Sequence, residues 1–115
     1  MAQLPGNGIY YAWGDGFSGY GLEMDDNLKK INTLINSGII DRDLSTPPGS
    51  PSEGDTYIVA ATGTGDWVGQ DNNIAVYVGA AWYFITPKIG TLVYIIDEDV
   101  LSAYKAAGWS VGISI

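Results

Sequence analysis

Short apolar runs separated by glycine-rich turns dominate residues 54–115, and this pattern constrains the fold more than any other feature of the sequence. The runs are rich in β-branched and aromatic side chains, which is typical of strands. With 115 residues and 16 glycines, the chain has room for one modest core. The sequence therefore predicts a mainly β fold, with a small antiparallel domain over residues 54–115. We expect strands at 55–60, 74–78, 82–86, 91–96, 100–105 and 109–113.

A weak internal repeat supports this interpretation. Residues 74–82 and 101–109 both read as an apolar residue, two further residues, Tyr, a short turn and Trp. In each copy the Tyr and the Trp lie five residues apart across a short turn, where cross-strand aromatic pairing is expected. The repeat predicts two similar hairpins that close one core. The expected core residues are Tyr57, Ile58, Tyr77, Trp82, Tyr94, Tyr104 and Trp109.

One amphipathic helix is predicted, at residues 23–37. Asp25 or Asp26 is a suitable N-cap, and Gly38 stands where a C-terminal cap residue is expected. A helix this short is marginal by itself and needs a partner surface, which is either the β domain or two symmetry mates. The narrow apolar stripe suits a short coiled-coil seam, and we predict a homotrimer with residues 24–36 near its axis. The stripe consists of Leu28, Ile31, Leu34 and Ile35.

Residues 1–22 form an extended, glycine-rich N-terminal arm that shows neither helical nor strand periodicity. Because disordered tails are usually poor in aromatic residues, we expect this arm to pack against its own domain or against a neighbouring protein, and we interpret it as a docking arm. Residues 38–53 are proline-rich and are expected to form a linker or a docked edge. The interface candidates in the arm are Tyr10, Tyr11, Trp13, Phe17 and Tyr20.

Composition disfavours several functional classes. The chain contains no cysteine and no histidine, so it has no disulfide, Cys/His zinc site, thiol nucleophile or histidine base. Its net charge of −8 disfavours nucleic-acid and anionic-lipid partners. No signal peptide is visible, and the longest apolar runs fall short of the roughly 20 residues that span a bilayer. We therefore expect neither nucleic-acid binding nor membrane insertion.

Two oxygen-rich stretches are the remaining candidates for chemistry. Asp97-Glu98-Asp99 is interpreted as a turn, because adjacent acids do not converge without a wrapped loop. The acids and amides of residues 66–73 are expected to satisfy their own backbone, although the sequence does not decide whether either stretch binds calcium. We predict no metal site, no cofactor and no enzymatic activity. Trp67, which lies in a polar loop, is the best candidate for an exposed aromatic that contacts a glycan.

The order and spacing of several motifs resemble a known family. MDxNLKK at residues 24–30 is followed by IDRDL at 40–44 and by PPGSPxxGDxYIV at 47–59, the most specific segment. WxGxD at 67–71, IAVY at 74–77 and AWxF at 81–84 complete the pattern. Together they resemble a domain of unknown function found in tail fibres of phages and gene transfer agents.

This resemblance implies a structural or host-attachment role in a phage tail. The expected partners are copies of the same chain, other tail or baseplate proteins, and a host-surface glycan. The expected location is the virion, after synthesis in the host cytoplasm. The alternative interpretation is a carbohydrate-binding module for receptor recognition. No catalytic residues are implied by the resemblance.

Overall fold

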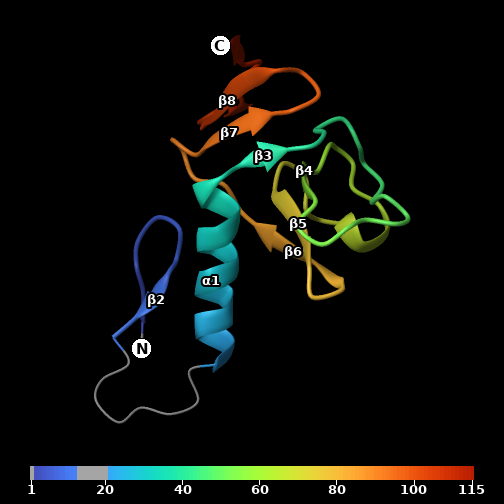
Figure 1. Cartoon of the computed structure of the whole chain (residues 1–115). Coiled ribbons are helices and arrows are strands. Elements are labelled where there is room, and N and C mark those ends of the chain that lie inside the picture. The colour runs from blue at the N-terminus through green and yellow to red at the C-terminus, as the bar shows by residue number, and fades with distance from the viewer. Residues whose placement is uncertain (1, 13–20) are drawn as a thin grey trace. The chain divides into compact units, whose positions relative to one another are not determined.

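A computed structural model describes residues 2–12 and 21–115, and the chain divides into two units, residues 1–36 and 37–115. The first unit contains a two-stranded antiparallel hairpin and one helix (Figure 1). The hairpin consists of β1 (Ala2–Gln3) and β2 (Tyr10–Tyr11), and the helix is α1 (Gly21–Ile35). The part of the predicted arm that is described therefore contains short strands, although its sequence has no strand periodicity.

Helix α1 begins and ends two residues earlier than predicted. Asp25 and Asp26 consequently lie inside the helix and do not cap it, and Glu23 is the acid of the first turn. The predicted role of Gly38 as a helix cap is also wrong, because this residue begins a strand. Gly38 pairs with Tyr94 of a distant strand, and this sheet pairing outweighs the local signal for a helix cap.

The second unit contains two small sheets (Figure 1). The first is the antiparallel sheet β4-β5-β6, and the second has the order β10-β8-β7-β3, with β9 paired to β8. The strands are β3 (Gly38–Ile39), β4 (Thr56–Ile58), β5 (Ile74–Val78), β6 (Ala81–Ile85), β7 (Leu92–Ile95), β8 (Val100–Lys105), β9 (Gly108–Trp109) and β10 (Ile113–Ser114). The predicted class, mainly β with one helix, is confirmed.

All strand pairs within residues 54–115 are antiparallel, as predicted, and β3, from the segment predicted as a linker, adds a parallel pair with β7. Immediately after β3, the Ile40 amide donates to the Thr56 carbonyl, and the Ile58 amide donates to the Asp41 carbonyl. The chain thus leaves one sheet and runs along the edge of the other. The segment predicted as a linker or docked edge is hydrogen-bonded to the β domain, and its first residues join the two sheets.

Both predicted hairpins are present. Tyr77 pairs with Trp82 and Tyr104 pairs with Trp109, and their ring centroids lie 5.2 and 5.1 Å apart in edge-to-face geometry. The β5–β6 turn has only two residues, Gly79 and Ala80, with φ angles of 64° and 60°. Positive φ at both central positions is the requirement of a type I′ turn, which matches the twist of the flanking strands.

The core of the second unit is more aliphatic than predicted. Of the expected core residues, Tyr57 and Ile58 are buried, whereas the other five are only partly buried. The aromatic pairs cover the hairpin ends, and the interior is filled by β-branched side chains. The hydrophobic residues with the least exposure are Ile39, Val59, Trp67, Ile74, Ala75, Val93 and Ile95.

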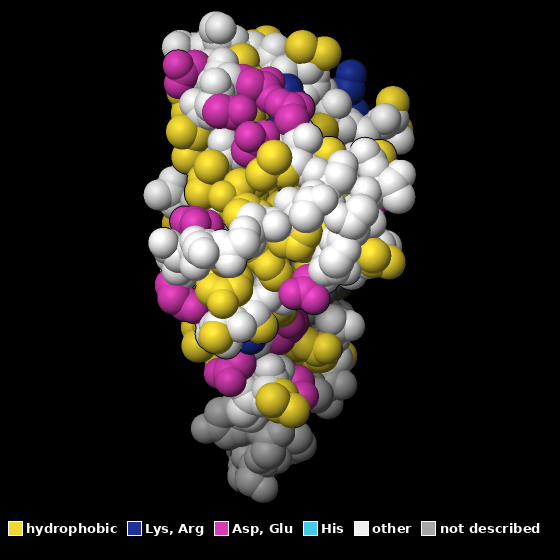
Figure 2. Space-filling model, turned by 90° about the vertical axis from the view of Figure 1, so that its right-hand side faces the viewer, with side chains coloured by type: hydrophobic (Ala, Val, Ile, Leu, Met, Phe, Trp, Pro, Cys, Tyr) yellow, Lys and Arg dark blue, Asp and Glu magenta, His cyan; other side chains and the backbone are white. Residues whose placement is uncertain are grey.

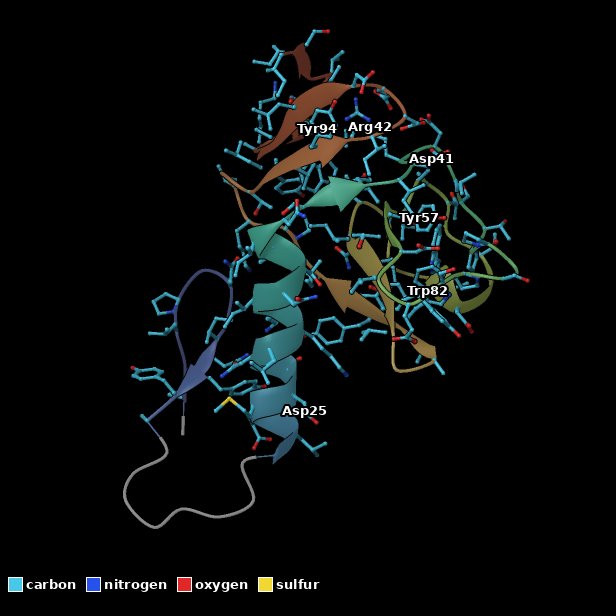
Figure 3. All side chains as sticks on the ribbon, in the orientation of Figure 1. Asp25, Asp41, Arg42, Tyr57, Trp82 and Tyr94 are labelled. Atoms are coloured by element: carbon cyan, nitrogen blue, oxygen red, sulfur yellow. The ribbon has the colours of Figure 1, made fainter. Side chains whose placement is uncertain are left out.

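Trp67 is the largest fully buried side chain of the second unit. It lies on the short 3-10 helix η1 (Gly65–Trp67) and packs against Tyr57 and Trp82, with ring centroids 5.8 and 5.2 Å away. A Cβ atom on Gly63 would overlap the Trp67 carbonyl oxygen, so the loop closes this tightly only with glycine there. Figure 3 shows Tyr57 and Trp82 beside the β4–β6 sheet.

We predict that Trp67→Ala lowers the free energy of unfolding by about 3–5 kcal/mol, because it removes a completely enclosed side chain. Trp82→Ala should cost less, since Trp82 is only partly buried. Chemical denaturation of both variants measures the difference. Val68→Ala, which changes an exposed neighbour, should stay within about 0.5 kcal/mol of the unmodified chain. A loss below about 1 kcal/mol for Trp67→Ala would contradict the buried position.

Candidate functional site

The hairpin of the first unit is held to α1 by one buried amide. Asn27 is 4% exposed, its Oδ1 accepts from the Tyr10 amide at 2.7 Å, and its Nδ2 donates to the Tyr10 carbonyl at 3.0 Å. The Asn27 side chain therefore hydrogen-bonds both the amide and the carbonyl of Tyr10, as the backbone of a neighbouring strand would. Losing either bond would leave a backbone group without a partner in a partly buried place, which is costly.

Lys30 adds a second polar contact on the same side of the helix. Its Nζ lies 3.0 Å from an Asp26 carboxylate oxygen and 3.4 Å from the Gly8 carbonyl oxygen. The same nitrogen lies 6.0 Å from the centre of the Tyr10 ring, at the outer limit of a cation–π contact. Asn27 and Lys30 thus give the hairpin three polar contacts with the helix.

The apolar stripe of α1 remains accessible. Leu28 is 56%, Ile31 43% and Ile35 78% exposed, whereas Leu34 is partly buried. Among the described residues of the first unit, the buried ones are polar, Asn27 and Thr33. This reverses the usual arrangement of an amphipathic helix, whose apolar face is covered. The stripe is therefore the strongest candidate for an assembly surface in this unit.

A groove of about 240 Å³ runs between the hairpin and the stripe. Ile31 and Ile35 form part of its wall, so the groove is continuous with the exposed stripe. Its other lining residues are Asn7, Ile9, Lys30 and Leu34.

The aromatic candidates of the arm have different positions. Tyr10 is partly buried and Tyr11 is exposed. Trp13, Phe17 and Tyr20 lie outside the described residues. The prediction that residues 1–22 dock onto a neighbouring protein therefore stays a prediction, with Tyr10 already engaged on α1.

The proposed glycan contact at Trp67 is corrected by its burial. The prediction assumed that a tryptophan in a polar loop is exposed, but its side chain has no accessible surface. The loop polar groups instead bond to one another: Asp71 Oδ1 accepts from the Gly63 amide, and Asn73 Nδ2 donates to Gln70 Oε1. These bonds close the loop over the indole ring, which a local sequence window could not reveal.

The acidic turn at residues 97–99 is organised by partners elsewhere in the second unit. The Glu98 carboxylate accepts two hydrogen bonds from the Arg42 guanidinium, at 3.0 and 2.8 Å, in a bidentate ion pair. These bonds hold the pKa of Glu98 below its usual value. Tyr94 donates to Asp99 at 2.7 Å, which raises the pKa of the Tyr94 hydroxyl. The segment is a turn, as expected from sequence.

A carboxylate cluster lies beside this turn. Asp41, Asp43 and Asp97 each place one carboxylate oxygen within 4.8 Å of the others. Figure 2 shows acidic side chains gathered on this face of the second unit. Partial desolvation raises the pKa of Asp97, and the neighbouring negative charges of Asp41, Glu98 and Asp43 raise it further. Sequence analysis missed this juxtaposition because Asp41 and Asp97 are brought together by the β3–β7 pairing.

Arg42 is the residue of this region that sequence analysis overlooked. Besides Glu98, its guanidinium donates to the Ser110 carbonyl at 2.8 Å and to the Val111 carbonyl at 2.7 Å. Figure 3 shows Arg42 with Asp41 and Tyr94 at the end of the unit that holds β3 and β7. Arg42 is the central residue of the IDRDL motif, and its place in that motif was the sequence feature that could have singled it out.

A larger groove of about 450 Å³ lies along β8 and β10 of the second unit. Its walls include Leu92, Leu101, Val111 and Ile113, with Lys105 as their one charged residue. The Ser102 hydroxyl in this wall is already engaged, since it donates to the Ser110 carbonyl at 2.8 Å. The groove lacks the convergent polar groups that orient a small ligand.

Residues 24–110 match the family described as "Protein of unknown function (DUF2793)", and the chain belongs to that family. The match begins within α1 and ends after β9, so it includes the apolar stripe, the Arg42–Glu98 pair and both hairpins. No curated protein matches the chain. Within the described residues, no helix is both long enough and apolar enough to cross a membrane.

We predict that Asn27→Ala releases the hairpin from α1, because it removes both bonds to Tyr10. Hydrogen exchange at the Tyr10 amide should accelerate about tenfold or more, which corresponds to roughly 1.4 kcal/mol of local stability. Asn36→Ala, at an exposed position after the helix, is the matched control and should leave this amide unchanged. Unaltered exchange in Asn27→Ala would contradict the proposed attachment.

A pH dependence follows from the Arg42–Glu98 pair. Because the pKa of Glu98 is lower in the folded chain, the pair stabilises the fold above the unfolded pKa of about 4.3 and loses its effect as pH falls through the folded value. Glu98→Gln should therefore destabilise the chain at pH 7, and this difference should shrink toward zero near pH 2–3. Denaturation at both pH values measures it. In an Arg42→Met background the same substitution should lose its pH-dependent effect; a persistent effect would assign it to another partner.

Proposed function

We propose that this chain is a non-catalytic structural protein that assembles into a homotrimer through α1. The observation that supports this most directly is the apolar row of Leu28, Ile31 and Ile35, which its own unit leaves exposed. Scattered exposed leucines are common in proteins, but these residues recur at intervals of three and four and form one continuous row. A 15-residue helix whose buried residues are polar gains little from its own unit, so a partner for the apolar row would stabilise it.

We propose that the assembled protein works in a phage tail, as a component that joins a fibre to the tail or contacts the host surface. This setting rests on the resemblance of the motifs at residues 24–90 to phage tail-fibre domains. The virion is then its place of action, after synthesis in the host cytoplasm, and other tail or baseplate proteins are its neighbours. Its mechanism is assembly by surface packing, with no reaction step.

The carbohydrate-binding alternative has less support from the geometry. Sugar stacking needs an accessible aromatic face, and among the described aromatic residues only Tyr11 is exposed. Trp67 is enclosed, and the hairpin residues Trp82 and Trp109 are partly buried in edge-to-face pairs. The exposed large hydrophobic side chains are mostly aliphatic, which suits packing against another protein better than stacking on a sugar.

The test is the mass of the purified full chain in solution, measured by light scattering over a range of concentrations. We expect a trimer for the unmodified chain and a monomer with an intact β domain for Ile31→Asp, because a charge cannot enter the apolar seam without a partner. Leu22→Asp is the matched control: Leu22 is 81% exposed on the same helix but lies outside the stripe, so the trimer should persist. A monomeric unmodified chain at high concentration would overturn the proposal.

A further inference from the structure

The spacing of three exposed stripe residues and the partly buried Met24 fixes one heptad register. Met24, Leu28, Ile31 and Ile35 are separated by four, three and four residues. Only one assignment places all of them at core positions, with Leu28 and Ile35 at a and Met24 and Ile31 at d. Leucine or isoleucine at a combined with isoleucine at d favours three- and four-stranded bundles over dimers. Threefold symmetry would then make the helices parallel.

The seam by itself is too small for a stable assembly. Each buried aliphatic side chain removes about 60–120 Å² of apolar surface, so four of them contribute about 240–480 Å² for each copy. Specific interfaces bury about 800 Å² for each partner. A stable trimer therefore needs further contact surface next to the seam.

The groove beside the hairpin supplies that surface. Leu34 occupies a g position in this register, and Ile9 of the hairpin lines the same groove together with the seam residues Ile31 and Ile35. In a parallel bundle the g side of one helix faces the e side of the next helix, which here carries Asp25 and Asn32. Figure 3 shows Asp25 near the start of α1.

We propose that the groove between the hairpin and α1 receives the α1 helix of a neighbouring copy, so that each hairpin forms part of the interface with the next chain. This inference rests on the proposed homotrimer. The groove is about 240 Å³, larger than the 150 Å³ cavity that accommodates a benzene molecule in an apolar protein interior, so part of a helix flank can enter it. The Asn27 bonds to Tyr10 hold the hairpin in place before assembly, which lowers the entropy lost on binding.

The first test changes the hairpin without touching the helix. Ile9→Asp should weaken trimer formation at least tenfold in dissociation constant, as measured by analytical ultracentrifugation of the full chain. Leu4→Asp is the control, because Leu4 is exposed on the same hairpin but does not line the groove. If the two variants assemble equally well, the groove is not part of the interface.

A cross-linking test covers the case in which Ile9→Asp disturbs the hairpin itself. The chain has no cysteine, so an introduced pair reports one contact. Ile9→Cys combined with Asn32→Cys should give covalent trimers on mild oxidation, because position 9 faces the g side of its own helix and Asn32 lies on the e side of the next. Leu4→Cys with Asn32→Cys should stay monomeric under denaturing, non-reducing conditions.

The outcomes separate the two proposals. A trimer that depends on Ile31 but shows neither the Ile9→Asp effect nor the cross-link would overturn the role of the groove and leave the proposed homotrimer standing. A monomeric unmodified chain would overturn both. Covalent trimers from the Ile9/Asn32 pair, together with weaker assembly of Ile9→Asp, would support the hairpin interface.

Discussion

The hydrogen bonds of the Arg42 guanidinium tie together segments of the second unit that lie far apart in sequence. Arg42 comes from the segment that leaves β3 for β4, and it binds the β7–β8 turn through Glu98 and the segment before β10 through two carbonyl groups. Arginine suits this place because its planar fork can donate in several directions at once, which a lysine ammonium cannot reproduce. One side chain thereby connects the crossover between the two sheets to the far edge of the larger sheet.

The first unit is held together on a different physical basis. Its hairpin is attached by the Asn27 amide and by Lys30, while the apolar row of α1 is exposed. Hydrogen bonds of this kind give orientation but little net free energy, typically about 1 kcal/mol each. A unit built in this way is ordered enough to present a surface and still has apolar area to gain from a partner. That combination is the physical reason for proposing assembly as its function.

Much of the β unit could be predicted because its signals are local. The β-branched and aromatic runs, the turn glycines and the Tyr/Trp spacing predicted the hairpins, and the pairs Tyr77–Trp82 and Tyr104–Trp109 are present. The predicted core was partly wrong, since large aromatic residues mark strands equally well at a hairpin edge and in the interior. The prediction that Trp67 is exposed was wrong for a related reason. Its burial depends on Tyr57 and Trp82, which lie outside the loop that holds it.

The sequence by itself determined the class of the fold, the stripe on α1, the acidic charge and the lack of cysteine and histidine chemistry, because these depend only on residue identity and short-range spacing. Tertiary structure alone decided the parallel β3–β7 pair, the convergence of Asp41 with Asp97, the role of Arg42 and the exposure of the stripe. The first three result from contacts between residues tens of positions apart, and the fourth from the lack of an apolar neighbour in the first unit. Such contacts form only when folding brings distant segments together, so a short stretch of sequence does not reveal them.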